Sequence, residues 1–393
     1  MLGIRFDKVM PVLTGASLLS IWTLDFVNLQ PNRILPGVGY SLQDAVGWWS
    51  MIIVTTLLIS AFLLSFSRLS LRRWLQLFIV TLLLVLMPIS LSSFAQNHIP
   101  ETLTHARTGL GSAFWLVFFL LVLMLIELQQ KLELSRSIYC FIFSFPLISI
   151  VFIYLMGGLD TLAILREYSA RSDQFHQAVH IHIALVGGAV ITSILLAACL
   201  VAMMRKSTTA QKIIFPLLNF IQTIPSLALF GLLIAPLGYI ASKSEWLQAM
   251  NVSGIGWAPA MIALIAYSLL PMVRNTFVAL EEVSESVIEA AKGMGMSPAQ
   301  VFIQVRLPLA MPVILEGIRI TTIQAIGLTA VAALIGAGGL GNFIFQGLGQ
   351  AAMDMVLLGA LPILLLAIIA DLFFSSVMTF FNQHTKQSGA TKS

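Results

Sequence analysis

The sequence predicts an all-α membrane protein with about ten transmembrane helices. Apolar residues make up 58% of the 393 positions, charged residues make up 10%, and the mean hydropathy is +0.95. A soluble domain carries about 25% charged residues, so this chain has too few of them to cover a water-facing surface. Apolar stretches near the roughly 20 residues that cross a bilayer recur along the whole chain.

Each predicted helix is an apolar segment of spanning length between more polar connections. The segments are 9–27, 45–66, 74–94, 109–127, 137–157, 180–203, 213–235, 256–280, 309–335 and 355–381. The first follows a short basic stretch, as in a signal peptide, but no small-residue cleavage site comes after it. It is therefore predicted to be the first transmembrane helix.

The positions of Lys and Arg predict that both termini are cytoplasmic, because cytoplasmic loops are enriched in these residues. With the N-terminus inside, most of the 21 Lys and Arg fall in inner loops or in the cytoplasmic halves of helices. The predicted outer loops hold only Arg33, Arg107, Arg166, Arg171 and Lys243. The pI of about 9.2 is attributed to the inner loops and not to nucleic-acid binding.

The chain divides into two parts at a polar outer connection, residues 158–180. The predicted N-terminal region, 1–160, holds five helices built mostly of Leu, Ile, Phe, Val and Ser. The second region, 161–382, holds five helices richer in Pro, Gly, Asn, Gln and Thr, which are typical of helices that pack closely or line a path. Residues 383–393 are predicted to form a cytoplasmic tail.

The longest inner loop, 281–308, reads EEVSESVIEAAKGMGMSPAQVFIQVRLP. Ser286 and Glu289 match the S-x-x-E capping box that starts a helix, and Ser297 with Pro298 can start a second one. The first helix has an apolar side formed by Val287, Ile288, Ala290, Ala291 and Met294. An apolar helix face in the cytoplasm needs a partner groove; the alternative is that the helix packs on its own protein.

This loop resembles the EAA signature of ABC-importer permeases. The matching positions run from Glu289 through Gly295 to Pro308, with Val305 where the family usually has Ile. In that family the loop is the coupling helix that docks into the ATPase subunit. The resemblance implies that coupling to an ATPase depends on Glu289, Ala290, Ala291, Gly295, Leu307 and Pro308.

Three further stretches, 219–231, 268–280 and 332–348, resemble the osmoprotectant branch of these permeases, which handles glycine betaine, choline and carnitine. The likeness covers about residues 176–381 and implies a type I importer core of five helices. The sixth helix departs from it, because residues 195–204 stand where a Gly-x-Pro-x-Gly is often found. The five extra N-terminal helices resemble the extended permeases of one lower-affinity betaine-type system.

The resemblance also implies the partners. Two permease subunits, expected to be identical, would pair in the bacterial cytoplasmic membrane above two cytoplasmic ATPase subunits, and an extracytoplasmic binding protein would deliver the solute. ATP and Mg²⁺ would be bound by the ATPase, so no cofactor and no catalytic residue is expected on this chain. The aromatic cage for a quaternary ammonium group would lie mainly in the binding protein.

Polar residues of the seventh segment predict a lining for the translocation path. Asn219, Gln222, Thr223 and Ser226 fall on one helical face, and Pro225 interrupts the backbone hydrogen bonds beside them. Broken helices and polar residues at membrane depth are tolerated where they face protein or a cavity. The alternative interpretation is hydrogen bonding between helices.

The run GAGGLG contains Gly336, Gly338, Gly339 and Gly341. It lacks the Lys-Ser/Thr of a phosphate-binding loop, and the topology places it at the outer face, away from ATP. Close helix packing and a flexible gate are the two interpretations of these glycines.

His176, His180 and His182 have helical spacing, but neither an HExxH motif nor a nearby Cys set accompanies them, so no metal site is predicted. Cys140 and Cys199 lie in apolar segments, which argues against a disulfide framework.

Two charges lie inside predicted helices. Arg319 and Asp371 each stand about ten residues from the inner end of their helix, near 15 Å depth at 1.5 Å per residue. Charges at this depth usually pair. A buried Arg319–Asp371 ion pair is predicted, with Glu316 as the competing partner of the arginine.

Three rival functions remain. The closest is the same kind of importer for another solute, such as methionine. A secondary transporter driven by an ion gradient would need ionisable residues along its path and would leave the loop 281–308 unexplained. An intramembrane enzyme would need paired catalytic groups, and neither these nor a GxSxG motif occur in the sequence.

Overall fold

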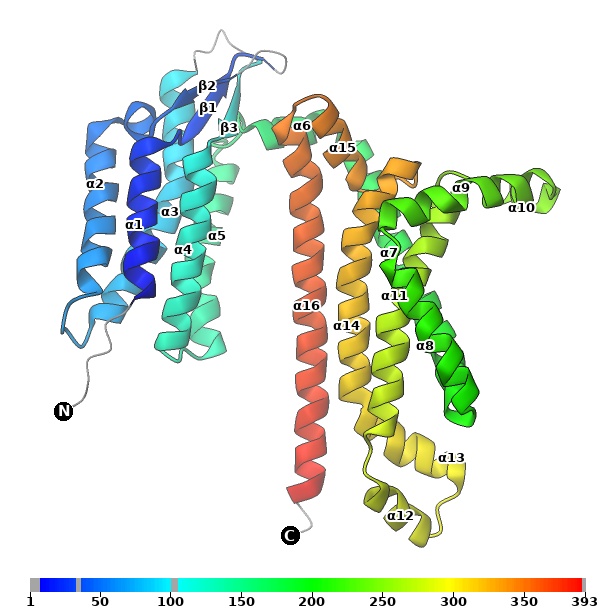
Figure 1. The fold of residues 1–393 in the computed structure, drawn as a ribbon. Coiled ribbons are helices and arrows are strands. Elements are labelled where there is room, and N and C mark those ends of the chain that lie inside the picture. The colour runs from blue at the N-terminus through cyan, green and yellow to red at the C-terminus, as the bar shows by residue number, and fades with distance from the viewer. Residues whose placement is uncertain (1–7, 33–36, 100–104, 391–393) are drawn as a thin grey trace. The chain divides into compact units, whose positions relative to one another are not determined.

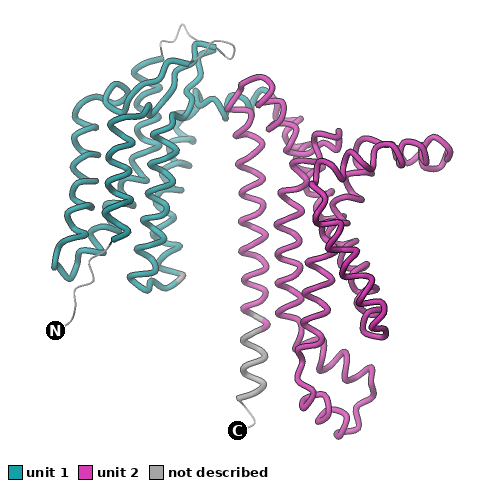
Figure 2. Tube along the Cα trace, in the orientation of Figure 1, with its two compact units in different colours: residues 1–170 teal, residues 171–393 magenta. Residues whose placement is uncertain are grey.

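The computed structural model describes residues 8–32, 37–99 and 105–390, and the chain divides into two compact units, Met1–Ala170 and Arg171–Ser393 (Figure 2). The first unit extends beyond the predicted boundary at residue 160, because helix α6 (Ala163–Ala170) belongs to it. The carboxylate of Glu167 on this helix is 1% exposed and lies 2.8 Å from the guanidinium of Arg107. This ion pair ties the end of the unit to its core.

The first unit is a bundle of five apolar helices with a small sheet across one end (Figure 1). The bundle helices are α1 (Val9–Thr23), α2 (Leu42–Leu64), α3 (Arg72–His98), α4 (Ser112–Lys131) and α5 (Arg136–Leu155). The strands are β1 (Val27–Gln30), β2 (Val38–Tyr40) and β3 (Arg107–Leu110). Helix α1 is shorter than predicted, since the chain leaves the helix after Thr23 to enter β1.

The sheet is an addition to the predicted all-α fold. Its order is β2-β1-β3, and both pairs are antiparallel, with Asn28 opposite Gly39 on one side and Gly109 on the other. These strands are connections between helices, and pairing them satisfies backbone N–H and C=O groups that helices do not take up. Glycine suits position 39, because a Cβ on Gly39 would collide with the carboxylate of Asp25.

A buried amide joins two helices of the first unit. Gln76 on α3 is 1% exposed, and its side-chain nitrogen donates to the carbonyl of Ala61 and to the hydroxyl of Ser65 on the end of α2, both at 3.0 Å. An unpaired amide at this depth would cost several kcal/mol. The bonds therefore fix the pairing of α2 with α3 inside an otherwise apolar core.

The second unit holds the remaining helices. They are α7 (Ser172–Lys206), α8 (Thr208–Thr223), α9 (Ser226–Ser242), α10 (Glu245–Ala249), α11 (Trp257–Glu281), α12 (Glu285–Gly293), α13 (Pro298–Gln300), α14 (Leu307–Ala332), α15 (Gly341–Gly349) and α16 (Met353–Ala390). A π-helical segment, Val301–Arg306, precedes α14, and a 3₁₀ turn, Ala333–Ile335, follows it. Helices α12 and α13 lie at one end of this unit, and α9, α10 and α15 lie at the other (Figure 1).

Helix α11 packs against both α7 and α14 through small residues. A Cβ added to Gly188 on α7 would lie 2.9 Å from Cε of Met261, and one added to Gly317 on α14 would lie 2.8 Å from Cβ of Asn275. In a membrane, lipid tails are as apolar as the side chains, so helices associate through close van der Waals packing instead. The glycines and the buried alanines of α11 allow that approach.

Eight helices of the described residues are long and apolar enough to cross a membrane, and α8 with α9 forms one further bent pair. Together with α1, they occupy the ten predicted segments. The predicted segment 213–235 is broken beside Pro225, where the chain turns by 103° between α8 and α9. Helix α16 continues through Ala390, so the residues predicted as a cytoplasmic tail are helical as far as that residue. Of the basic residues used for orientation, Arg5, Arg33 and Lys392 lie outside the described residues.

Candidate coupling and translocation site

Helix α12 begins two residues earlier than the sequence suggests. Its N-cap is Ser284, with extended ψ, and the helix starts at Glu285. Ser284 makes no side-chain capping bond, and its hydroxyl instead lies 2.7 Å from that of Ser286. The predicted capping box of Ser286 with Glu289 is therefore wrong, because both residues already lie inside the helix. Glu289 is exposed on its surface.

Gly295 ends α12 through a Schellman motif. Its φ is +84°, its N–H donates to the carbonyl of Lys292 at 2.9 Å, and the N–H of Met296 donates to the carbonyl of Ala291 at 3.3 Å. This pair of bonds, in which the first donor is also the left-handed residue, defines the motif, and glycine suits that position because it has no Cβ. A Cβ on Gly295 would meet no atom of this chain within 4 Å. The constraint within the chain is therefore on the backbone.

The second half of the loop starts with a complete capping box. The Ser297 hydroxyl accepts from the N–H of Gln300, whose side chain accepts from the N–H of Ser297 at 2.8 Å, and Pro298 occupies the first turn. The π-helical segment that follows has a local cause. Pro308 has no N–H to give to the carbonyl of Gln304, and the N–H of Leu307 bonds five residues back, to Phe302.

The apolar residues of α12 face two ways. Ile288 and Ala291 are 3% and 2% exposed, and they pack with Val301 in a small core of the loop itself. Val287, Ala290 and Met294 point outward at helical spacing, and the last of them is 76% exposed. We call these three the α12 stripe. One part of the apolar side of α12 therefore packs within the loop itself, and the other part is exposed.

The loop is joined to α7 near its C-terminal end. Nε of Arg205 lies 3.4 Å from a carboxylate oxygen of Glu281, and its guanidinium lies 5.8 Å from the ring centroid of Phe302. A cation above an aromatic face is stabilised by the ring's quadrupole. Arg205 therefore contacts both the entrance to the loop and its exit. The sequence analysis did not identify this contact, because it joins residues far apart in the chain.

The bend between α8 and α9 is held by α11. Helix α8 ends at Thr223, Pro225 stands at the N-cap of α9, and the hydroxyl of Tyr267 donates to the carbonyl of Ile224 within the break. The side-chain nitrogen of Gln222 donates to the main-chain carbonyl of Tyr267 at 2.5 Å. That carbonyl is open because its helical donor would be residue 271, which is a proline.

The residues predicted to line a path lie at this break, but they do not all share one environment. Asn219, Thr223 and Pro225 are exposed, and Ser226 is half-buried. The Thr223 hydroxyl returns a bond to the carbonyl of Phe220 at 2.7 Å. Gln222 is turned towards α11, so the alternative interpretation of interhelical hydrogen bonding describes this residue.

The glycine run packs closely between helices. Gly336, Gly338 and Gly339 have φ values of +78°, +81° and +82°, which glycine adopts without strain. A Cβ on Gly341, the first residue of α15, would collide with the carbonyl of Ala330. The carbonyl of Ile335, just before the run, accepts the N–H of Gly256 at 2.7 Å. Of the two interpretations of these glycines, the contacts favour close helix packing over a flexible gate.

Arg319 on α14 lies between two carboxylates. Its Nε donates to Oδ1 of Asp371 on α16 at 2.7 Å, and Nη1 lies 3.2 Å from Oε2 of Glu316, one turn away on its own helix. Both partners considered from the sequence are therefore in contact. The pair is less buried than predicted, because the Arg319 and Asp371 side chains are 28% and 39% exposed on the surface of the single chain.

His182 is fully buried between α7 and α14. Its Nε2 lies 3.2 Å from the carbonyl of Ile326, while Nδ1 has no hydrogen-bond partner and would lie 3.3 Å from a Cβ on Gly339. Within the described ranges, no group of three or more His, Cys, Asp or Glu residues could hold a metal ion. This histidine therefore contributes to packing behind the glycine run.

Comparison with known proteins adds the family. Residues 189–387, a little over half of the chain, match the family described as binding-protein-dependent transport system inner membrane component. Residues 7–165, which lie within the first unit, match the N-terminal domain of the ABC transporter permease YehY. Each unit of the structure thus has its own match.

Three curated relatives are similar over part of the chain. The choline transport system permease protein OpuBB of Bacillus subtilis is 39% identical over 192 residues, 49% of this chain and 80% of that protein. The carnitine transport permease protein OpuCB of Listeria monocytogenes is 35% identical over the same shares of each chain. The osmoprotectant import permease protein OsmW of Salmonella typhimurium is 44% identical over 149 residues, 38% of this chain and 64% of that protein.

The match over residues 189–387 covers the helices α11, α14 and α16 with the loop between the first two, so sequence and structure agree on the same region. The chain therefore belongs to the family of binding-protein-dependent transport system inner membrane components and is a multi-pass inner-membrane permease of the ABC transporter class.

Proposed function

We propose that this chain is the translocation subunit of an ATP-driven importer for quaternary ammonium osmoprotectants such as glycine betaine, choline or carnitine. The solute class comes from the relatives, because OpuBB is named for choline, OpuCB for carnitine and OsmW for osmoprotectants generally. The residues that match the family model, 189–387, include the bend between α8 and α9 and the loop that holds α12.

One observation carries the coupling part of the proposal: the α12 stripe is apolar and exposed, and the other side of its helix packs into a core within the loop. Met294 is 76% exposed at the helix end, and the small core around Ile288 holds α12 in place from its other side. An amphipathic helix of this kind binds by placing its apolar face in a groove. The partner would be a cytoplasmic ATPase subunit, which would carry the ATP and Mg²⁺, so this chain itself performs no hydrolysis.

The path would form where α8 breaks. Asn219, Thr223 and Pro225 are exposed in the single chain, and polar backbone at membrane depth needs protein or a water-filled cavity beside it. A second, identical copy of the chain would cover this face, and the solute would pass between the two copies. An extracytoplasmic binding protein would deliver it. Both termini would lie in the cytoplasm, and so would the loop that holds α12 and α13.

The test combines uptake with co-purification. Cells with and without this chain are given labelled glycine betaine, choline and carnitine, with labelled methionine as the comparison solute, and the tagged chain is purified in mild detergent. The proposal expects loss of osmoprotectant uptake alone in the deleted strain, together with an ATPase subunit that co-purifies with the chain. Equal osmoprotectant uptake in both strains, with a difference for methionine, would overturn the solute class. Repeated purification without an ATPase would overturn the coupling.

A further inference from the structure

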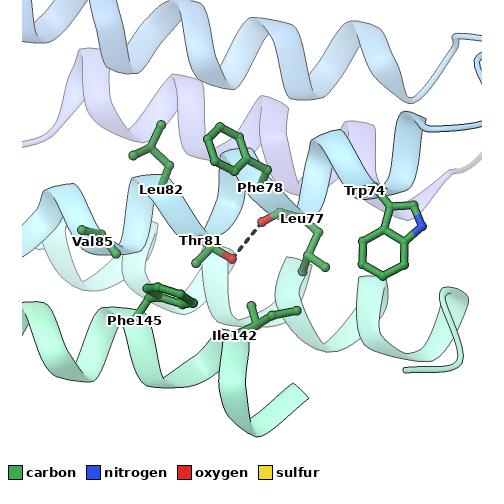
Figure 3. A pocket seen from close by; sticks show the side chains of 8 residues that line it. All are labelled: Trp74, Leu77, Phe78, Thr81, Leu82, Val85, Ile142 and Phe145. Carbon is green, nitrogen blue, oxygen red and sulfur yellow. Dashed lines mark hydrogen bonds between the residues drawn. The ribbon is translucent and has the colours of Figure 1, made fainter. Parts of the chain in front are cut away.

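An apolar groove runs along the first unit between α3 and α5. Its volume is about 420 Å³, and Figure 3 shows its lining, with Trp74 at one end and Val85 towards the other. Leu77, Phe78, Thr81 and Leu82 line it from α3, and Ile142 and Phe145 line it from α5. The hydroxyl of Thr81 is satisfied, because it donates to the carbonyl of Leu77 at 2.8 Å. The indole N–H of Trp74 is at one end of the groove, and the stretch beyond it is apolar and suits a hydrocarbon chain.

The length of the groove along α3 matches the thickness of the hydrocarbon part of one membrane leaflet. Trp74 lies in the first turn of α3, and Val85 lies three turns further on, about 17 Å away at 1.5 Å per residue. Half of a bilayer's hydrocarbon core is about 15 Å. Trp is enriched where the hydrocarbon meets the headgroups, so Trp74 marks the level at which a lipid's headgroup would begin.

The Trp74 end of the groove is basic. Arg68 is exposed in the connection before α3, and Arg72 starts the helix and donates to the carbonyl of Ser67 at 2.7 Å. A guanidinium carries five N–H donors, so Arg72 keeps others for a ligand. Arg73 donates to the carbonyl of Lys131 at 2.9 Å, which brings the end of α4 to the same place.

Two acidic residues lie on α4 and in the turn after it, near Lys131 in the sequence. Glu127 lies 2.5 Å from Nζ of Lys131 and compensates that lysine, and Glu133 lies in the turn with φ of +50°. Arg68, Arg72 and Arg73 therefore outnumber the remaining carboxylate. A net positive charge at headgroup level, directly above an apolar groove, is complementary to a lipid that has a negative headgroup and an acyl chain.

We propose that this groove binds an anionic phospholipid from the leaflet at the Arg72 end, with its phosphate on Arg68 and Arg72 and one acyl chain against Phe78, Thr81 and Phe145. Basic pockets between transmembrane helices at the cytoplasmic side are known to bind anionic headgroups. Zwitterionic lipid would fit the groove equally well but would gain little from the arginines. The headgroup charge therefore decides the preference.

The first experiment measures lipid retention on the purified full-length chain. The chain is extracted in mild detergent, mixed with equal amounts of phosphatidylglycerol and phosphatidylcholine of the same acyl chains, and analysed by native mass spectrometry. We expect phosphatidylglycerol to be retained preferentially. Each of Arg68→Gln and Arg72→Gln should lower its retention about fivefold, the effect of about one charge near a membrane surface.

Matched substitutions separate this groove from the general lipid surface. Thr81→Phe fills the groove, whereas Thr56→Phe makes the same change at an exposed position of α2. Arg166→Gln removes one arginine at the opposite end of the same unit, where it also donates to a carbonyl. Only the groove variant and the two basic-end variants should lose phosphatidylglycerol. Equal loss in the controls, or equal retention of both lipids by the unaltered chain, would mean ordinary surface lipid and would overturn the proposal.

The second experiment asks whether lipid or protein occupies the groove in a bilayer. The chain, with any co-purifying subunits, is placed in nanodiscs that contain phosphatidylglycerol brominated in its acyl chains. The contribution of Trp74 is the difference between the unaltered chain and Trp74→Phe, because the chain has seven Trp. Quenching of this contribution, stronger than with brominated phosphatidylcholine, is expected. A second copy or a partner helix in the groove would shield Trp74 from both lipids and would overturn the proposal.

Discussion

Gln222 supplies to the carbonyl of Tyr267 the hydrogen bond that Pro271 withholds, and in return the hydroxyl of Tyr267 binds the carbonyl of Ile224 in the break of α8 and α9. Each helix thus supplies a side-chain donor to a backbone carbonyl that a proline or a break leaves open in the other. Helix-breaking residues are tolerated in membranes where neighbouring side chains take up the freed backbone groups. This exchange fixes the bend at one place against α11.

Loss of the Gln222 amide should loosen the bend. Gln222→Leu leaves the carbonyl of Tyr267 without a donor, and hydrogen bonds between membrane helices contribute about 0.6 kcal/mol on average and up to about 1.7. We expect a lower melting temperature of the purified chain and slower solute uptake. Thr223→Val serves as the control, because its hydroxyl bonds only to its own helix, at Phe220.

Pro271→Ala provides the decisive cross-check, because an alanine N–H can donate to Tyr267 itself. In the Pro271→Ala background, Gln222→Leu should lower the stability of the chain only slightly. The double-mutant cycle should therefore show a coupling energy of about 1 kcal/mol. Additive effects of the two substitutions would show that the bond does not stabilise the bend.

Asp371 should matter more than Glu316 for holding Arg319. Asp371→Asn weakens the shorter contact, 2.7 Å from Nε, and hydrogen bonds to charged groups contribute about 1.5–3 kcal/mol. Glu316 is further from the arginine at 3.2 Å, so Glu316→Gln should have a smaller effect. Membrane abundance and melting temperature of the two variants measure this order. Equal losses in both would show that neither carboxylate is the main partner.

The α12 stripe should be needed for transport and not for folding. Ala290→Glu places a charge in its middle, whereas Ser286→Glu makes an exposed charge on the same helix outside it. We expect normal membrane abundance for both, with loss of ATPase co-purification and of uptake for Ala290→Glu alone. Normal uptake in the Ala290→Glu variant would remove the coupling assignment of this helix.

Gly295 should be sensitive to any side chain because of its backbone. Its φ of +84° costs an L-residue about 1–2 kcal/mol, so Gly295→Asp should shift the end of α12 and displace Met294 at the end of the stripe. The protein should still insert, since the loop lies outside the membrane, but uptake and ATPase co-purification should fall. Gly293→Asp is the comparison, because Gly293 lies within α12 and has open space around it.

The packing role of Gly341 can be separated from helix propensity. Gly341→Ala would drive its Cβ into the carbonyl of Ala330, and overpacking usually costs about 1–3 kcal/mol. Gly327→Ala, in the middle of α14 with no atom within 4 Å of the added Cβ, should be neutral or slightly stabilising. Melting temperatures of the two variants test this. A tolerated Gly341→Ala with altered uptake would favour a gate over packing.

The apolar segments were predictable because length and hydropathy are local properties. The loop 281–308 was predictable for a similar reason, since capping residues, glycines and apolar spacing occur within 28 consecutive positions. Even there, the pattern S-x-x-E misplaced the first cap. Ser284 and Ser286 are both acceptable N-cap residues. The packing of Ile288 and Ala291 against Val301 fixes which of the two serines caps the helix.

The Arg319–Asp371 contact could be predicted across 52 positions because charges in an apolar helix have few possible partners. The bonds of Gln222 and Tyr267 could not be predicted in the same way. A proline at 271 shows that a carbonyl is open, but many polar side chains could reach it, and the choice depends on how α8 lies against α11.

The sequence by itself determined that this is a membrane protein of two helical regions with a short helix of apolar side in the loop 281–308, because these features follow from composition and short-range spacing. The tertiary structure alone decided the sheet of β1, β2 and β3, the turn of 103° between α8 and α9, and the groove between α3 and α5. Each depends on contacts between segments far apart in the chain. Strands of three or four residues and single hydrogen bonds carry too little local signal to specify their partners, so packing selects them.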